Sequence, residues 1–128
     1  MWKGVHIGIL GLENQSLVDY GMVFRNMKTE AISYSKQWIE KEKEYRRTGQ
    51  LGEKEEFGWS DLAREVRFIP IIMIVIYLGT DKAWDGARCL YDMLQIHKEL
   101  EPFVTNYKLN LFDYHEYEDF PFLKQRID

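Results

Sequence analysis

Apolar positions form three short runs separated by longer amphipathic stretches, an order that indicates an α/β protein. The first run, residues 5–12, is rich in branched side chains and too short for an independent helix. It therefore predicts a strand. A polar cluster at residues 13–16 follows at the expected C-terminal end of that strand.

Residues 21–47 carry apolar side chains at alternating spacings of three and four, which is typical of one long helix. We expect this stripe to face the core; its members are Phe24, Met27, Ala31, Tyr34 and Trp38. Two glycines within residues 48–52 end the helix. A further short helix is expected at residues 60–64, capped by Ser60 and Asp61.

Residues 67–79 contain a continuous apolar run instead of an alternating one. Such a run predicts a central, parallel strand that is covered on both faces. Pro70 is compatible only with the beginning of this strand.

The last third of the chain predicts one more helix and one more strand. Residues 87–98 indicate a helix, capped by Asp85, whose inward residues are Leu90, Met93, Leu94 and His97. Residues 107–112 alternate and predict a half-buried strand. We expect one domain over residues 1–128, a small mixed sheet flanked by helices with an acidic aromatic tail at 113–128.

Two polar side chains in the first cluster have the chemistry of a metal site. Glu13 and Gln15 are two residues apart, so an extended backbone directs both to the same side. A carboxylate ligates Mg²⁺, and a neighbouring amide can orient a metal-bound water. The alternative interpretation is a solvated strand end.

The charge of the chain is negative overall but unevenly distributed. The formal net charge is −4, which argues against a dedicated nucleic-acid binder. The predicted long helix nevertheless groups four basic residues within about 40° at about 100° per residue: Arg25, Lys36, Lys43 and Arg47. These residues either contact DNA phosphates or form a solvated helix face.

Cysteine content and hydropathy limit the kinds of site and the cellular compartment that the sequence predicts. Cys89 is the single cysteine, so the sequence predicts neither an internal disulfide nor a zinc site. The longest apolar run is too short to cross a bilayer, and we expect a cytoplasmic protein without a membrane partner. His6 and His97 are expected to pack, and Trp84 either contacts a partner or packs in a turn. The tail aromatics (Tyr114, Tyr117, Phe120 and Phe122) either dock to a partner or lie on the surface.

Several motifs occur together in one order over residues 5–112. They are GLENQS at 11–16, YxMxxRNM at 20–27, AxxYxxQ at 31–37, RxIP at 67–70 leading into VIYxG at 75–79, WDGxxxLxxML at 84–94 and PxVxxYxxNL at 102–111. In these motifs the chain resembles the recombination-promoting nuclease (transposase-like) family, a branch of the PD-(D/E)XK nucleases.

The resemblance implies a partial restriction-endonuclease-like core and a magnesium-dependent DNA endonuclease. Glu13 would be its acidic metal ligand, and Gln15 would replace the usual lysine and place the attacking water. The family's first metal-binding aspartate lies on a preceding strand, whereas residues 1–12 contain no Asp or Glu. We therefore expect a truncated nuclease-like domain whose isolated monomer is inactive unless another subunit supplies the acid.

The alternative is a catalytically inactive interaction protein, such as an acidic inhibitor of a nuclease or defence complex, or a partner of a full-length homologue. Without the neighbouring strand, the sheet edge beside Glu13 is expected to be exposed. Exposed edges pair with other strands, so either interpretation predicts a homo-oligomer or a complex with another protein.

Overall fold

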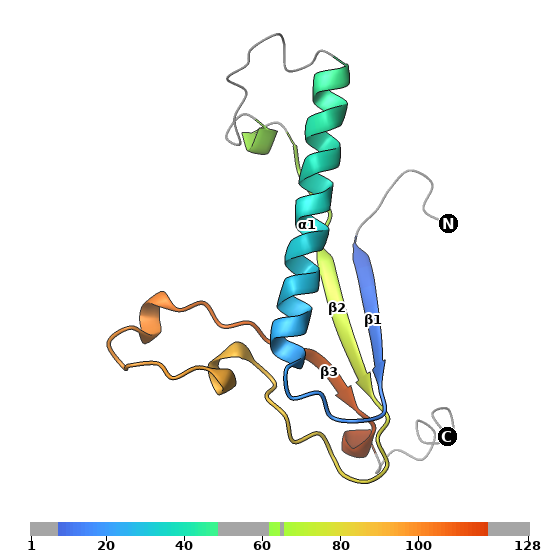
Figure 1. Cartoon of the computed structure of the whole chain (residues 1–128), viewed down its shortest axis with the longest axis vertical. Helices are drawn as coiled ribbons and strands as arrows, with labels where there is room; N and C mark the ends of the chain where they lie inside the picture. The colour runs from blue at the N-terminus through green and yellow to red at the C-terminus, as the bar shows by residue number, and fades with distance from the viewer. Residues whose placement is uncertain (1–7, 49–61, 65, 118–128) are drawn as a thin grey trace.

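The computed structural model describes residues 8–48, 62–64 and 66–117 and has an α/β architecture, with one long helix beside a small sheet (Figure 1). The main elements are β1 (Ile9–Gln15), α1 (Met22–Arg47), β2 (Ile71–Tyr77) and β3 (Asn110–Asp113). Three short 3₁₀ turns complete the order: η1 (Leu90–Met93), η2 (Glu101–Phe103) and η3 (Tyr114–Tyr117).

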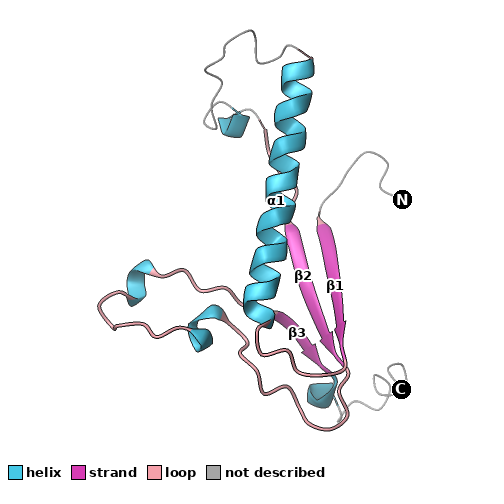
Figure 2. Ribbon diagram, in the orientation of Figure 1, coloured by secondary structure: helices cyan, strands magenta, loops and turns pink. Residues whose placement is uncertain are grey.

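The sheet has the order β1-β2-β3, and both pairs of neighbouring strands are parallel. The predicted central, parallel strand is thus confirmed as β2, and Pro70 directly precedes it. The expectation of a mixed sheet is wrong for the described strands. Because all strands run the same way, their carboxyl ends meet at one end of the sheet, beside the beginning of α1 (Figure 2).

Strand β1 extends three residues further than the sequence pattern predicted. It ends at Gln15, whose carbonyl accepts a hydrogen bond from the Leu78 N–H at 2.9 Å. Glu13 and Gln15 therefore belong to the strand itself instead of following it. The predicted beginning, residues 5–7, lies outside the described residues.

The core lies between α1 and one face of the sheet. Met22 from α1 packs with Val75 and Tyr77 from β2, and Trp84 closes the cluster from the following loop. The Tyr77 and Trp84 rings meet edge to face at 5.4 Å. Each such buried side chain contributes about 1.5–3 kcal/mol by leaving water. For Trp84, the packed-turn alternative is therefore confirmed.

Helix α1 has the predicted bounds, but a different face is buried. Met22, Val23 and Asn26 are its buried residues, whereas Phe24 is 49% exposed and Tyr34 is 38% exposed. The helix, at about 39 Å, is much longer than a strand of about 23 Å, so only its first turns lie on the sheet. Periodicity identified an apolar stripe but could not tell which neighbour the stripe would meet.

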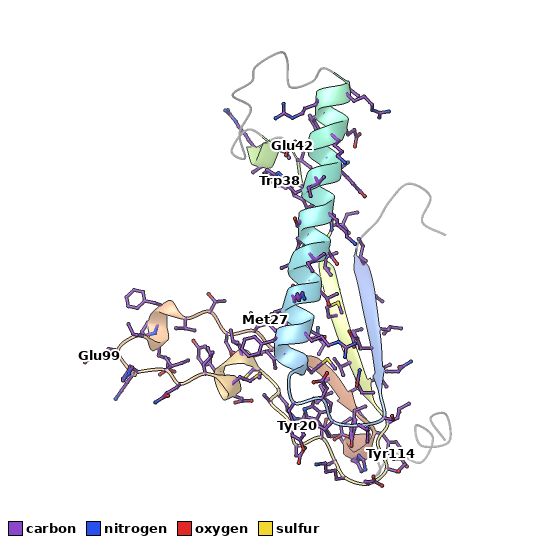
Figure 3. The ribbon with its side chains drawn as sticks, viewed as in Figure 1. Tyr20, Met27, Trp38, Glu42, Glu99 and Tyr114 are labelled. Atoms are coloured by element: carbon purple, nitrogen blue, oxygen red, sulfur yellow. The ribbon has the colours of Figure 1, made fainter. Side chains whose placement is uncertain are left out.

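The second half of α1 contacts the segment that precedes β2. Gln37 donates to the Ile69 carbonyl and accepts from its N–H, both at 2.9 Å. Trp38, whose position Figure 3 labels, stacks on Phe68 with ring centroids 5.6 Å apart. Trp38, which the sequence placed in the core, thus forms a half-buried contact beyond the sheet.

The second face of β2 is only partly covered by the described residues. Burial alternates along the strand, with Ile71, Met73, Val75 and Tyr77 buried and the residues between them more exposed. The expectation of cover on both faces is therefore wrong for the described chain. A continuous apolar run indicates that both faces of a strand are apolar, but it does not tell which residues cover them.

The helix predicted at residues 87–98 is absent. Its place is taken by an arm in which η1 and η2 are the only helical turns, with Glu99 near its tip (Figure 3). Leu90 is buried as predicted, but Leu94 and His97 are exposed. Backbone groups here pair across the arm, as in the bond from the Leu90 N–H to the Tyr107 carbonyl, so they are not free for a helix.

Two further predictions for the second half of the chain differ from the structure or fall partly outside the described residues. Strand β3 begins at Asn110 and ends at Asp113, later than the predicted 107–112. Residues 62–64 are helical as expected, whereas Ser60 and Asp61 lie outside the described residues, as do His6, Phe120 and Phe122. No helix in the described part of the chain is long and apolar enough to cross a membrane.

Candidate metal and DNA-binding residues

Glu13 and Gln15 lie side by side near the carboxyl end of β1. The Gln15 Nε2 donates to the Glu13 Oε2 at 3.4 Å, which confirms that the extended backbone directs both side chains to one side. That side is the one covered by α1, and the Glu13 side chain is only 17% exposed. The predicted pair is thus a local arrangement imposed by strand geometry.

Arg25 on the first turn of α1 joins Glu13 to a second carboxylate. Its Nη2 lies 3.4 Å from the Glu13 Oε2 and its Nη1 lies 3.3 Å from the Asp19 Oδ2. Asp19 also accepts a hydrogen bond from the Gly21 N–H at 2.9 Å, which orders the turn before the helix. The guanidinium therefore balances two carboxylates at the strand end.

The side chains at this site are of the type that binds a hard divalent cation, but too few of them gather among the described residues to hold one. A carboxylate and an amide oxygen are suitable ligands for Mg²⁺, which commonly uses one or two carboxylates together with water and substrate phosphate. Within residues 8–48, 62–64 and 66–117, no three Asp, Glu, His or Cys side chains gather to hold a metal ion. The described residues by themselves do not complete a metal site.

The predicted basic stripe is exposed along α1. Arg25 is engaged by the two carboxylates, whereas no ion pair between described residues involves Lys36, Lys43 or Arg47. At about 1.5 Å per residue, the stripe extends about 33 Å from the Glu13 site. Its spacing lets it follow a phosphate backbone, and it equally suits a solvated helix surface.

The outer edge of β1 adjoins this site. Among the described strands β1 pairs only with β2. The Ile9 N–H and the Gln15 carbonyl bond toward β2, so by alternation the backbone groups of Leu10, Leu12 and Asn14 point to the open edge. These unpaired groups can accept another strand directly beside Glu13.

A buried carboxylate orders the other loops at this end of the sheet. Asp113 accepts hydrogen bonds from the Trp84 N–H at 2.8 Å and from the backbone and ring of His115 at 3.0 and 2.8 Å. Burial by itself raises the pKa of the Asp113 carboxyl, but these bonds outweigh it and the pKa lies below its ordinary value. Asp113 is thus a structural acid.

A surface network ties the loop after β1 to the loop after β2. Tyr20 donates to Asp85 at 2.8 Å, and Lys82 lies 3.0 Å from the same carboxylate. The hydrogen bonds from Tyr20 and then from Lys82 lower the pKa of Asp85. The predicted role of Asp85 as a helix cap is wrong because the α-helix expected at residues 87–98 is not formed; the residue fastens two loops instead.

Comparison with known proteins gave no match: no family model, no curated protein and no solved structure is similar to this chain.

Sequence reasoning missed the two acids that structure this end of the sheet. Asp19 could have been suspected because it lies two residues before Gly21, and aspartate side chains in turns commonly accept from the backbone N–H two residues further on. Asp113 gave no comparable signal, because its partners Trp84 and His115 come together only through the tertiary fold.

Proposed function

We propose that this chain is a subunit related to the recombination-promoting nucleases, with one half of a divalent-metal site at Glu13 and Gln15. The site would act on DNA phosphodiesters once a strand from another chain pairs with the open edge of β1. One observation carries this proposal: the two side chains lie together on an edge strand that has no outer neighbour among the described residues.

Each half-site residue would have its own task. The Glu13 carboxylate would hold Mg²⁺, with the Gln15 amide orienting a water beside it. When bound, the metal supplies charge stabilisation at the phosphate. Arg25 now holds the Glu13 carboxylate at 3.4 Å, keeping it oriented until a cation of higher charge displaces the guanidinium.

Strand addition would supply the missing acid. Directly opposed residues on neighbouring antiparallel strands have Cβ atoms about 4.5–5.5 Å apart. An Asp or Glu opposite Glu13 on an added strand could therefore share one cation with it. This completes the PD-(D/E)XK arrangement that the sequence motifs imply and makes activity dependent on association.

The basic stripe would hold the DNA. Lys36, Lys43 and Arg47 form no ion pair within the described chain, so their charges remain available to phosphates. Contacts of this kind position the duplex without reading its sequence.

A plasmid-nicking assay tests the catalytic part of the proposal. Purified chain, at concentrations at which copies of it can pair through the β1 edge, is incubated with supercoiled plasmid and Mg²⁺ or Mn²⁺, beside three variants. We expect the wild-type chain to nick the plasmid and the Glu13→Ala variant not to. The control Glu99→Ala removes an exposed glutamate on the arm and should still nick. Asn14→Pro removes an N–H from the open edge, leaves the bonds to β2 intact and should also abolish nicking. Absence of cutting with both metals would refute the catalytic proposal.

The second candidate is an inactive protein that acts only by binding, such as an acidic inhibitor of a nuclease complex or a partner of a full-length homologue. It is favoured by the Arg25 contact, which neutralises the one metal-ligand candidate on β1. For this candidate neither metal gives nicking. Binding to the partner is then sensitive to Asn14→Pro and insensitive to Glu13→Ala.

A further inference from the structure

The face of the sheet turned away from α1 is apolar and partly exposed. Side chains alternate along a strand, so the residues between the buried ones share this face. Leu10 and Leu12 of β1 are 61% and 64% exposed, Ile72 of β2 is 39% exposed and Phe112 of β3 is 47% exposed. The described residues leave this surface partly in water, and contiguous patches of this type mark interaction sites.

The face turned away from α1 carries no charged side chain among its described strand residues. Its polar members are the amides Asn14 and Asn110, and the Asn110 amide bonds to the Met73 carbonyl at 3.0 Å. The opposite face, by contrast, carries Glu13 and Asp113. A chain in which 30% of residues are charged and the net charge is −4 has thus kept one sheet face neutral.

The face has a ridge next to a hollow. Leu10 and Leu12 form the ridge along β1, since they are its most exposed apolar side chains. Beside them is a hollow of about 450 Å³, with Ile74 and Ile76 among its lining residues and an aromatic wall formed by Phe112, Tyr114 and Tyr117. Figure 3 shows Tyr114 at the carboxyl end of the sheet, next to the end of β3.

We propose that this face is the interface of a homodimer in which two sheets pack face to face. A two-fold contact needs one surface that complements itself, and a ridge adjacent to a hollow satisfies this requirement. Leu12 of each copy would enter the hollow of the other, with the sheets about 10 Å apart. A second copy also matches the neutral face with another neutral face, so the net negative charge of each copy stays outside the contact.

The dimer is independent of the nuclease-like half-site. Glu13, Gln15 and Arg25 lie on the α1 side of the sheet, so packing of the opposite face leaves them accessible. The outer edge of β1 also remains open. Failure of one proposal therefore does not entail failure of the other.

Sedimentation equilibrium of the full chain tests the dimer directly. We expect wild type to form a dimer of twice 15.4 kDa at high micromolar concentration. Leu12→Glu should weaken dimerisation at least about 100-fold, because each interface would bury two unpaired carboxylates. Leu100→Glu introduces the same change at a residue that is 55% exposed on the arm and should leave the dimer intact. Circular dichroism of each variant establishes that it is folded.

A covalent crosslink tests the same contact without depending on whether the Leu12→Glu variant folds. In a Cys89→Ser background, a short bismaleimide reagent should crosslink Leu12→Cys between copies, since it spans sheets about 10 Å apart, whereas Leu100→Cys should not be crosslinked. A monomeric wild type overturns the proposal, and so does a dimer that tolerates Leu12→Glu. A dimer that is disrupted by Asn14→Pro but resists Leu12→Glu also overturns it, since that result identifies the strand edge as the contact.

Discussion

The Arg25 guanidinium lies 3.4 Å from the Glu13 carboxylate and links the beginning of α1 to the end of β1. The arginine side chain is 56% exposed, so water screens this pair and its contribution to stability is about 1 kcal/mol or less. Its larger consequence is chemical. The contact occupies the carboxylate that we propose as a metal ligand.

Competition between Arg25 and a divalent cation can be measured. Arg25→Gln should raise the affinity of the chain for Mn²⁺ about 5- to 10-fold, because the carboxylate loses its resident positive charge, an effect of about 1 kcal/mol. Glu13→Gln should remove this binding. Titration calorimetry gives both values. Lys41→Gln releases Glu44 in the same way, so an equal gain in that control would show a nonspecific charge effect.

The buried carboxylate of Asp113 predicts an acid-dependent loss of stability. Its pKa is lowered in the folded state, so its contribution is present above the unfolded pKa of about 3.9 and is lost as pH falls through the folded value. Asp113→Asn should cost about 2 kcal/mol at neutral pH by weakening the charge-assisted bonds from Trp84 and His115. It should also flatten the decline in melting temperature below about pH 4.

Thermal unfolding across pH measures this difference. Asp81→Asn removes an exposed carboxylate and serves as the control. A variant of Asp113 with wild-type stability at neutral pH would show that its hydrogen bonds contribute little.

Asn26 is a buried amide without a hydrogen-bond partner among the described residues. It is 0% exposed on the buried face of α1, and neither its oxygen nor its nitrogen is bonded. Asn26→Leu has a similar volume and should raise the free energy of unfolding by about 1 kcal/mol. Asn106→Leu should instead lower it by about 1 kcal/mol, because the Asn106 side chain accepts from the Tyr91 N–H at 2.9 Å. Urea denaturation distinguishes the two; destabilisation by Asn26→Leu would mean that the amide is satisfied in solution.

The basic stripe can be tested by the salt dependence of DNA binding. Replacing Lys36, Lys43 and Arg47 with Gln should reduce the slope of log affinity against log salt by roughly 2 to 3, since each phosphate that is no longer neutralised removes about 0.9 from the slope. A control triple at Lys28, Lys98 and Lys108 changes the net charge equally. Fluorescence anisotropy on a duplex gives the slopes, and equal slopes for the two triples would identify the stripe as a solvated face.

The observed helices and strands agree with the sequence-based predictions where the spacing of apolar residues was regular or where glycine or proline marked an end. The bounds of α1 agree within one residue, because its spacing pattern is long and glycines follow it. β2 begins right after Pro70, and the side-by-side placement of Glu13 and Gln15 follows from strand alternation. The helix prediction for residues 87–98 was wrong because their helical spacing competes with backbone bonds across the arm, which no local pattern records.

The sequence by itself determined an α/β order, a central apolar strand and a carboxylate–amide pair on one side of β1, since each depends on backbone periodicity. Only the tertiary structure decided that Arg25 holds Glu13, that Trp84 and His115 surround Asp113, and that the described residues leave one sheet face partly exposed. These relationships join residues that are distant along the chain. Their distances and burial depend on how the layers pack, and a linear pattern of side chains does not contain that information.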